Sequence, residues 1–286
     1  MIIFHDPRCI EYARAGHVER PARITRTVPL LKERHPKWKW QVPRAAGEAA
    51  LLRAHTAAHL ASIRAASRDF DADCPAYDDI YDHAVRAAGA ALEVAQAAKK
   101  GEAGFALMRP PGHHATRDQV VGFCYLSNLA IAALDALENG VERVAIWDFD
   151  AHHGNGTEAI LHGNSRIAFA SIHQYPGWPG TGTRSFDNIS NYPVAPGTSR
   201  TAHMNEIRRA LDGLLGFKPD LLLASAGFDA YKGDPIMEMT LEQEDFAILG
   251  EWLRDCGVPA GTILEGGYSD ELPDLIDTFI SKWAGD

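Results

Sequence analysis

Short apolar runs alternate with longer helical patterns along most of this chain, and that alternation restricts its fold more than any other feature. Six apolar runs predict strands: Ile2–His5, Gly104–Met108, Val144–Asp148, Ile167–His173, Leu221–Ala226 and Thr262–Leu264. Helical patterns lie between them, at roughly Asp82–Lys99, Asn128–Glu138, Thr157–His162, Ala202–Leu215, Leu241–Cys256 and Leu272–Trp283. Alternation at this spacing predicts βαβ units and a mainly parallel sheet with helices on both faces.

The organisation of the chain favours one domain over residues 1–286. It has no linker-like stretch, low-complexity run or internal repeat, and 46% hydrophobic with 23% charged residues is ordinary for a globular protein. The longest irregular stretch is expected at Gln174–Pro196, which is rich in proline and glycine. A loop of that length in a compact domain usually has a functional role.

Composition also limits the partners and the compartment. The formal net charge is −10, and no basic run is longer than a pair, which argues against general nucleic-acid binding. The four cysteines are scattered without a C-x-x-C spacing, as expected in a reducing compartment and not in a thiolate zinc site. The N-terminus lacks a signal-peptide pattern, and apolar runs stay short of the roughly 20 residues of a membrane helix. We therefore expect a cytoplasmic protein without a membrane partner.

Polar residues flanked by glycine or proline follow five of the predicted strands. These segments are Arg109–His114, Asp148–Gly154, His173 with Trp178–Gly182, Gly227–Asp229 and Glu265–Tyr268. Each one alone has a structural explanation, since a tandem histidine or a Gly-Gly-Tyr turn is common in loops. However, ligands of open α/β sheets bind beyond the carboxyl ends of the strands. Five such clusters at one sheet edge therefore indicate a functional site.

The segment Asp148-Phe149-Asp150-Ala151-His152-His153-Gly154-Asn155 directly follows an apolar run. Ionised groups at the end of a buried strand must be paired, hydrogen-bonded or metal-bound, although a solvated turn uses the same residue types. Asp150 and His152 offer two metal ligands, and Asp229 is the best third candidate. Three protein ligands with open positions form the pattern of catalytic zinc, and the carboxylates also admit Fe²⁺ or Mn²⁺.

The neighbouring residue types suit metal-assisted hydrolysis of an amide. A metal in such a site polarises a carbonyl and acidifies a bound water. The tandem His113-His114 offers a general base and a second imidazole. Asp148 and Asn155 are placed to bind the other ring nitrogens of these histidines and so to set their tautomers. Tyr268 can donate a hydrogen bond to a developing oxyanion.

Six ordered motifs together resemble the histone deacetylase superfamily, which includes acetoin-utilisation proteins and acetylpolyamine amidohydrolases. They are Arg109–His114, Gly122-Phe123-Cys124, Asp148–Gly156, Pro179–Gly182, Gly227–Pro235 and Leu264–Tyr268. The resemblance extends from His17-Val18-Glu19-Arg20-Pro21 to the end of the chain. Its wording at Asn155 and at Leu264–Tyr268 is similar to the class II branch and its bacterial relatives. The resemblance implies an α/β, single-domain, three-layer arginase–deacetylase fold with a mainly parallel central sheet.

The resemblance also implies a role for each catalytic residue. Asp150, His152 and Asp229 would bind zinc, with Fe²⁺ an alternative in vivo. His114 would act as general base and then as general acid, with His113 as its electrostatic partner. Asp148 would pair with His113, Asn155 would pair with His114, and Tyr268 would polarise the acetyl carbonyl.

By the same resemblance, a narrow tunnel would admit the acylated side chain. Phe123 and Trp178 would form its walls, although family members usually carry a second phenylalanine at the position of Trp178. Gly122, Ile236 and Asp73 would complete the substrate contacts, and Asp73 lies in a loop that departs from the family wording. A structural potassium ion would bind backbone oxygens and one hydroxyl, from Asp148, Asp150, His152, Ile172 and Ser171.

Several residues near these motifs have simpler interpretations. His153 is expected to be structural, and His173 is expected to anchor a loop. His162 and His203 lie on helical patterns and are expected to be solvated. Arg20 precedes a predicted helix and is expected to hold a loop through a charged hydrogen bond.

The sequence therefore predicts a zinc-dependent amidohydrolase that removes acetyl or other acyl groups from lysine side chains in peptides or proteins. Acylated small amines such as polyamines are the alternative substrates, because Asp73 and Glu238 could select a second positive charge, although Ile236 is apolar where a polyamine-specific branch has an acid. A non-catalytic acyl-lysine binding module would usually have lost a metal ligand or the tyrosine. A binuclear arginase-like hydrolase would need further ligands. The oligomeric state is left open.

Overall fold

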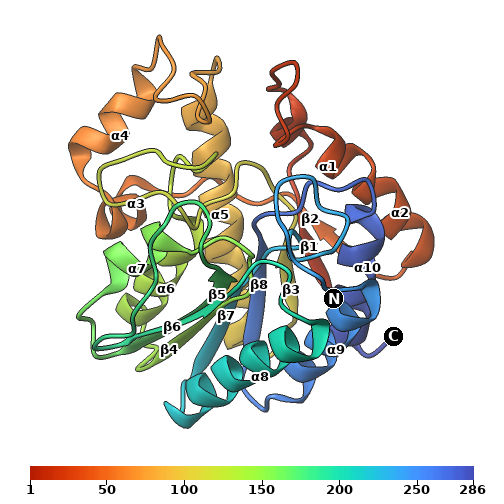
Figure 1. The fold of residues 1–286 in the computed structure, drawn as a ribbon. Coiled ribbons are helices and arrows are strands. Elements are labelled where there is room, and N and C mark those ends of the chain that lie inside the picture. The colour runs from red at the N-terminus through yellow and green to blue at the C-terminus, as the bar shows by residue number, and fades with distance from the viewer.

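An eight-stranded, entirely parallel sheet forms the centre of the computed structural model, which describes residues 1–286 (Figure 1). In spatial order the strands are β2 (Lys39–Gln41), β1 (Ile2–Phe4), β3 (Gly104–Ala106), β8 (Ala260–Leu264), β7 (Leu221–Ala226), β4 (Val144–Asp148), β5 (Ile167–Gln174) and β6 (Ile189–Val194). All seven neighbouring pairs are parallel. The predicted sheet class and all six predicted strands are confirmed.

The central strands were predictable because they are buried on both faces. Every residue of β4 and β7 is buried, so both read as continuous apolar runs. The two edge strands, β2 and β6, were not predicted. Two of the three residues of β2 are exposed, and β6 has no regular alternation of apolar and polar residues and contains Pro193. We had expected the stretch Gln174–Pro196 to be irregular throughout, and this is wrong, because it contains β6.

Six helices confirm the helical patterns: α5 (Ile80–Lys99), α6 (Asn128–Glu138), α7 (Asn155–Leu161), α8 (Arg200–Gly216), α9 (Gln243–Asp255) and α10 (Leu272–Ala284). Short elements precede them and were not predicted: η1 (Pro7–Ile10), α1 (Ala22–Thr25), α2 (Thr27–Arg34), α3 (Glu48–Ala54) and α4 (Ala57–Arg64). Elements of four to eight residues show a helical period only weakly in the sequence, and α7 is the one helix of this length that was predicted.

Helices flank the sheet, as Figure 1 shows. The alanine-rich helix α5 lies close against the sheet. The approach is so close that a Cβ on Gly261 of β8 would come within 2.4 Å of the Val94 side chain on α5. Helix α8 packs against β4 and β5. None of the helices has both the length and the apolar composition to cross a membrane.

The two helical histidines differ in their surroundings. His162 is exposed, as expected, and lies 2.8 Å from the carboxylate of Asp187. His203 was expected to be solvated, and this is wrong: it is completely buried, and neither ring nitrogen has a hydrogen-bond partner. Burial lowers the pKa of His203 to about 4, so the ring is neutral at pH 7. It lies on α8, where it contributes to the packing of that helix.

A buried charge cluster joins the N-terminal segment to the loop after β3. Arg109 is completely buried, and its Nη2 donates to Glu19 Oε2 at 2.9 Å. Arg23 Nη1 lies 3.3 Å from Glu19 Oε1. Burial alone would raise the pKa of Glu19, but the guanidiniums of Arg109 and Arg23 outweigh it and hold that pKa below its usual range. One carboxylate therefore compensates two buried cations.

We expect Glu19→Gln to lower the free energy of unfolding by about 3–5 kcal/mol, because both guanidiniums would stay buried without a counter-charge. Urea unfolding followed by circular dichroism measures this change. The control is Asp212→Asn, which removes an exposed carboxylate paired with Arg208 on α8. The control is expected to change stability by less than about 1 kcal/mol. Equal losses in both variants would contradict the interpretation.

Candidate active site

The segments that follow β3, β4, β7 and β8 meet at the carboxyl edge of the sheet. Asp150, His152 and Asp229 place one ligand atom each within 4.8 Å of one another, and all three are buried. His152 Nδ1 lies 2.7 Å from Asp229 Oδ2 and 3.3 Å from Asp150 Oδ1. The structure thus brings together the three residues that the sequence suggested as metal ligands.

Backbone groups hold both carboxylates in place. Asp150 Oδ2 accepts the N–H of Gly266 at 2.7 Å, and Asp229 Oδ1 accepts the N–H of Ala151 at 2.8 Å. A Cβ on Gly266 would lie 2.5 Å from Asp150 Oδ2 and 2.6 Å from Asp229 Oδ2. Only glycine permits this approach, which explains the first glycine of the Gly-Gly-Tyr turn.

The donor set fits a divalent metal ion. Two fully buried carboxylates that face one imidazole need a positive charge between them. Burial, together with the charge of Asp150, raises the pKa of Asp229 above its usual range, so a cation between the two carboxylates would favour the ionised pair. Two oxygens and one nitrogen leave coordination positions open, as in catalytic zinc and related sites.

The tandem histidines lie beside this group, each with the partner that the sequence suggested. His114 Nδ1 lies 2.7 Å from Asn155 Oδ1. Because that oxygen can only accept, Nδ1 carries the proton and His114 Nε2 is free to accept one. His113 Nδ1 lies 3.2 Å from Asp148 Oδ2, and its Nε2 lies 3.8 Å from Asp150 Oδ1.

The surroundings of the two rings separate their protonation states. Burial would lower the pKa of His113, but the carboxylates of Asp150 and Asp148 outweigh it and raise that pKa to about 10. Burial lowers the pKa of His114 well below its usual value, and the neighbouring His113 and His152 lower it further. The arrangement favours a cationic His113 beside a neutral His114, which is the protonation that a general base needs.

A cavity of about 210 Å³ opens above these groups. It is lined by Asp73, His114, Gly122, Phe123, His152, Trp178, Ile236 and Tyr268. Tyr268 is 8% exposed, whereas Trp178 and Ile236 are 46% and 37% exposed. The tyrosine therefore lies deep in the cavity, and the other two side chains lie at its mouth. All five residues suggested for substrate contact from the sequence are among those that line it.

Glycine is required at position 122 because of the neighbouring rings. Gly122 has a φ of +52°, and a Cβ there would lie 2.4 Å from Trp178 and 2.7 Å from His114. The Trp178 and His114 rings meet edge-to-face, with centroids 4.6 Å apart. The broader indole thus packs directly against the proposed base.

Three further residues position these groups and were missed in the sequence. Glu265 Oε2 accepts the N–H groups of Gly112 (2.7 Å) and His113 (3.1 Å). Arg23 Nε donates to the carbonyl of Gly267 at 2.8 Å. Asp234 Oδ2 accepts the N–H of Tyr268 at 2.8 Å, and its Oδ1 accepts that of Ile236 at 3.1 Å. Their partners are backbone groups, which a sequence motif does not reveal.

The other sequence interpretations concern the sheet edge around β5. His153 Nδ1 lies 2.8 Å from the Thr181 hydroxyl, and His173 Nε2 lies 3.1 Å from the Gly182 carbonyl, so both histidines anchor the loop that carries Trp178. Ser171 is paired with Asp148 in the β4–β5 register, and its hydroxyl lies 3.0 Å from His173 Nδ1. The potassium site stays a prediction.

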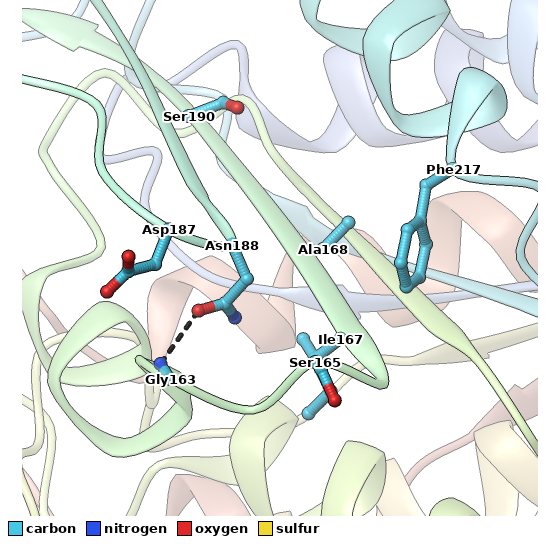
Figure 2. A pocket seen from close by; sticks show the side chains of 8 residues that line it. All are labelled: Gly163, Ser165, Ile167, Ala168, Asp187, Asn188, Ser190 and Phe217. Atoms are coloured by element: carbon cyan, nitrogen blue, oxygen red, sulfur yellow. Dashed lines mark hydrogen bonds between the residues drawn. The ribbon is translucent and has the colours of Figure 1, made fainter.

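A larger, more open hollow of about 570 Å³ lies at the outer part of β5 and β6 (Figure 2). It is lined by Gly163, Ser165, Ile167, Ala168, Asp187, Asn188, Ser190 and Phe217. Figure 2 shows that the side-chain oxygen of Asn188 accepts the N–H of Gly163, so this oxygen already has a hydrogen-bond partner. The one carboxylate of the hollow, Asp187, is paired with His162, and the candidate metal ligands lie elsewhere, so the smaller cavity remains the candidate active site.

Comparison with known proteins agrees with this geometry. Residues 17–281 match the family model described as the histone deacetylase domain. An uncharacterised protein of Synechocystis sp. is 39% identical over 280 residues, which cover 92% of this chain and 91% of that protein. The histone deacetylase-like amidohydrolase of Pseudomonas aeruginosa is 36% identical over 90% of this chain and 74% of its own length.

The fold agrees as well. The crystal structure of acetylpolyamine aminohydrolase from Burkholderia pseudomallei superposes with a TM-score of 0.91 at 27% identity, over 99% of this chain and 98% of that one. These relatives support a deacetylase type of hydrolysis. The chain belongs to the histone deacetylase family.

Proposed function

We propose that this protein is a zinc-dependent amidohydrolase that removes acetyl or other acyl groups from acylated lysine side chains. One observation carries the proposal: the cavity is lined by a neutral His114, by Tyr268 and by His152, which belongs to the group of candidate metal ligands with Asp150 and Asp229. Phe123, Trp178 and Ile236 give the cavity aromatic and apolar walls, which suits the methylene chain of lysine, and Asp73 adds one carboxylate to the lining. Its floor is polar, where an amide would react.

Each residue of the site can carry out one step of amide hydrolysis from its position around the cavity. The acylated chain lies between Phe123 and Trp178, with its carbonyl toward the floor of the cavity. When bound at Asp150, His152 and Asp229, zinc would polarise that carbonyl and acidify a water. His114 Nε2 takes a proton from the attacking water and then delivers it to the departing amine nitrogen. The Tyr268 hydroxyl donates to the developing oxyanion, and the cationic His113 stabilises the added negative charge.

Acylated small amines are a second candidate class of substrate. The matched relatives named acetylpolyamine amidohydrolase favour it. The apolar Ile236 at the mouth argues against it, because a polyamine brings a second cation there, whereas the carboxylate of Asp73 in the same lining favours it. A non-catalytic module is disfavoured, since all the groups needed for catalysis are present. The structure contains one group of candidate metal ligands, and this argues for one catalytic metal ion and against a binuclear site.

The purified protein tests this proposal. We expect metal-stripped protein to be inactive, and we expect added Zn²⁺ to restore release of acetate from acetyl-lysine peptides. Fe²⁺ and Mn²⁺ form parallel arms, and acetylpolyamines form the second set of substrates. Activity without metal would overturn the zinc dependence. If the protein hydrolysed acetylpolyamines and not acetyl-lysine peptides, the proposed substrate class would be overturned.

Tyr268→Phe is expected to lower kcat on acetyl-lysine by roughly 10²–10³-fold, because it removes one donor to the oxyanion and no other group. Zinc content and the free energy of unfolding should stay at wild-type values. The kcat of the variant on an activated trifluoroacetyl-lysine substrate should fall much less, since that carbonyl needs less polarisation. Steady-state kinetics on both substrates measure this. Tyr175→Phe, on an exposed tyrosine, is the matched control, and equal losses on both substrates would indicate a disrupted site.

A further inference from the structure

A groove of about 320 Å³ adjoins the active-site cavity. The groove is lined by Arg14, Gly16, His17, Val18, Arg20, Pro235 and Tyr268. It shares Tyr268 with the cavity, and its Pro235 precedes Ile236 of the cavity mouth. The part of a substrate that stays outside the tunnel can therefore lie in this groove.

Basic side chains line the groove, and no carboxylate does. Arg14 is neutralised by Asp69, whose two oxygens accept from both of its terminal nitrogens at 2.7 and 2.9 Å. Arg20 is different. Its Nη2 lies 3.3 Å from Asp270 Oδ1. The same oxygen also accepts a hydrogen bond from Nη1 of Arg26, at 2.5 Å.

One carboxylate thus serves two guanidiniums, and the Arg20 side chain is 50% exposed. A positive charge therefore remains in the groove, although the net charge of the whole chain is −10. The sequence suggested only that Arg20 holds a loop. The 3.3 Å contact with Asp270 fits that role, but it leaves the other donors of Arg20 without a partner.

His17 keeps the groove in place beside the tunnel. Its ring contacts the tunnel wall, with its centroid 4.9 Å from that of Phe123. Its Nδ1 lies 3.1 Å from both the backbone nitrogen and the carbonyl oxygen of Glu19, and its Nε2 donates to the Asp73 carbonyl at 3.2 Å. The carboxylate of Asp73 is among the groups that line the tunnel mouth, and Asp73 adjoins the groove through this backbone contact with His17.

We propose that Arg20 in this groove binds a carboxylate of the substrate and thereby selects acyl-lysines over acylated polyamines. This inference rests on the proposed function. A guanidinium forms paired hydrogen bonds with a carboxylate, whereas a polyamine would bring a second cation to the same place and be repelled. The carboxylate is either the free α-carboxylate of an acyl-lysine or an acidic side chain next to it in a peptide.

Three small substrates of different charge test the inference. Nα,Nε-diacetyl-lysine carries a carboxylate, its methylamide is neutral, and N-acetylcadaverine carries a cation at the same end. We expect kcat/KM to fall in that order, by about fivefold at each step and mainly through KM. Raised salt should shrink these differences, because exposed charges are screened. Peptides with glutamate or glutamine beside acetyl-lysine distinguish the acidic side chain from the free α-carboxylate.

The variants Arg20→Gln and Arg20→Lys complete the test. Arg20→Gln should bring the carboxylate-to-neutral ratio of kcat/KM close to one, and Arg20→Lys should keep most of the preference. Arg209→Gln, an exposed arginine on α8 that pairs with Glu206, should keep the wild-type ratio. An unchanged ratio in Arg20→Gln would overturn the inference alone. Failure to hydrolyse any of the substrates would overturn the proposed function and this inference with it.

Discussion

Asp229→Ala is expected to lose bound metal and deacetylase activity together, with a fall in turnover of at least ~10³-fold. Asp229 supplies one of three converging ligand atoms, and it is completely buried. The variant would leave Asp150 and His152 with weak chelation, and the buried carboxylate of Asp150 would lose the counter-charge of the metal. Asp150→Ala should behave in the same way.

Metal analysis after dialysis measures the first effect, and acetate release measures the second. The control is Asp245→Ala, which removes a buried carboxylate that caps α9 and pairs with Arg200. It should lower stability but keep the metal. If Asp229→Ala retained a full complement of metal, Asp229 would not be a ligand.

His114→Ala is expected to lower kcat by about 10²–10⁴-fold while metal content and inhibitor affinity change little. His114 is the neutral imidazole of the pair, held through Nδ1 by Asn155, and it faces the cavity. It moves a proton and does not hold the metal, so its loss should affect turnover far more than binding.

His113→Ala is the comparison for this experiment, and His162→Ala is its control. His113 is held cationic by Asp150 and Asp148, and its loss should cost less turnover than the loss of His114. His162 is exposed on the surface, and its substitution should leave kcat at the wild-type value. A larger loss in His113→Ala than in His114→Ala would reverse the two assignments.

Local patterns in the sequence were sufficient for the central architecture. The strands β4 and β7 could be predicted because burial on both faces makes every position apolar. The short N-terminal helices and the edge strand β6 could not, because their patterns are set by tertiary contacts and by solvent on one side. His203 shows the same limit: a helical pattern with polar neighbours did not reveal that its ring is buried.

The candidate site divides in the same way. The sequence by itself determined which reactive residues are available and at which strand ends they lie, because parallel strands bring their carboxyl ends to one edge. Only the tertiary structure decided how the charges are balanced. Whether His113 or His114 is cationic depends on carboxylates from other segments. The groups that position Tyr268 and the charge left on Arg20 likewise depend on contacts between residues far apart in the chain.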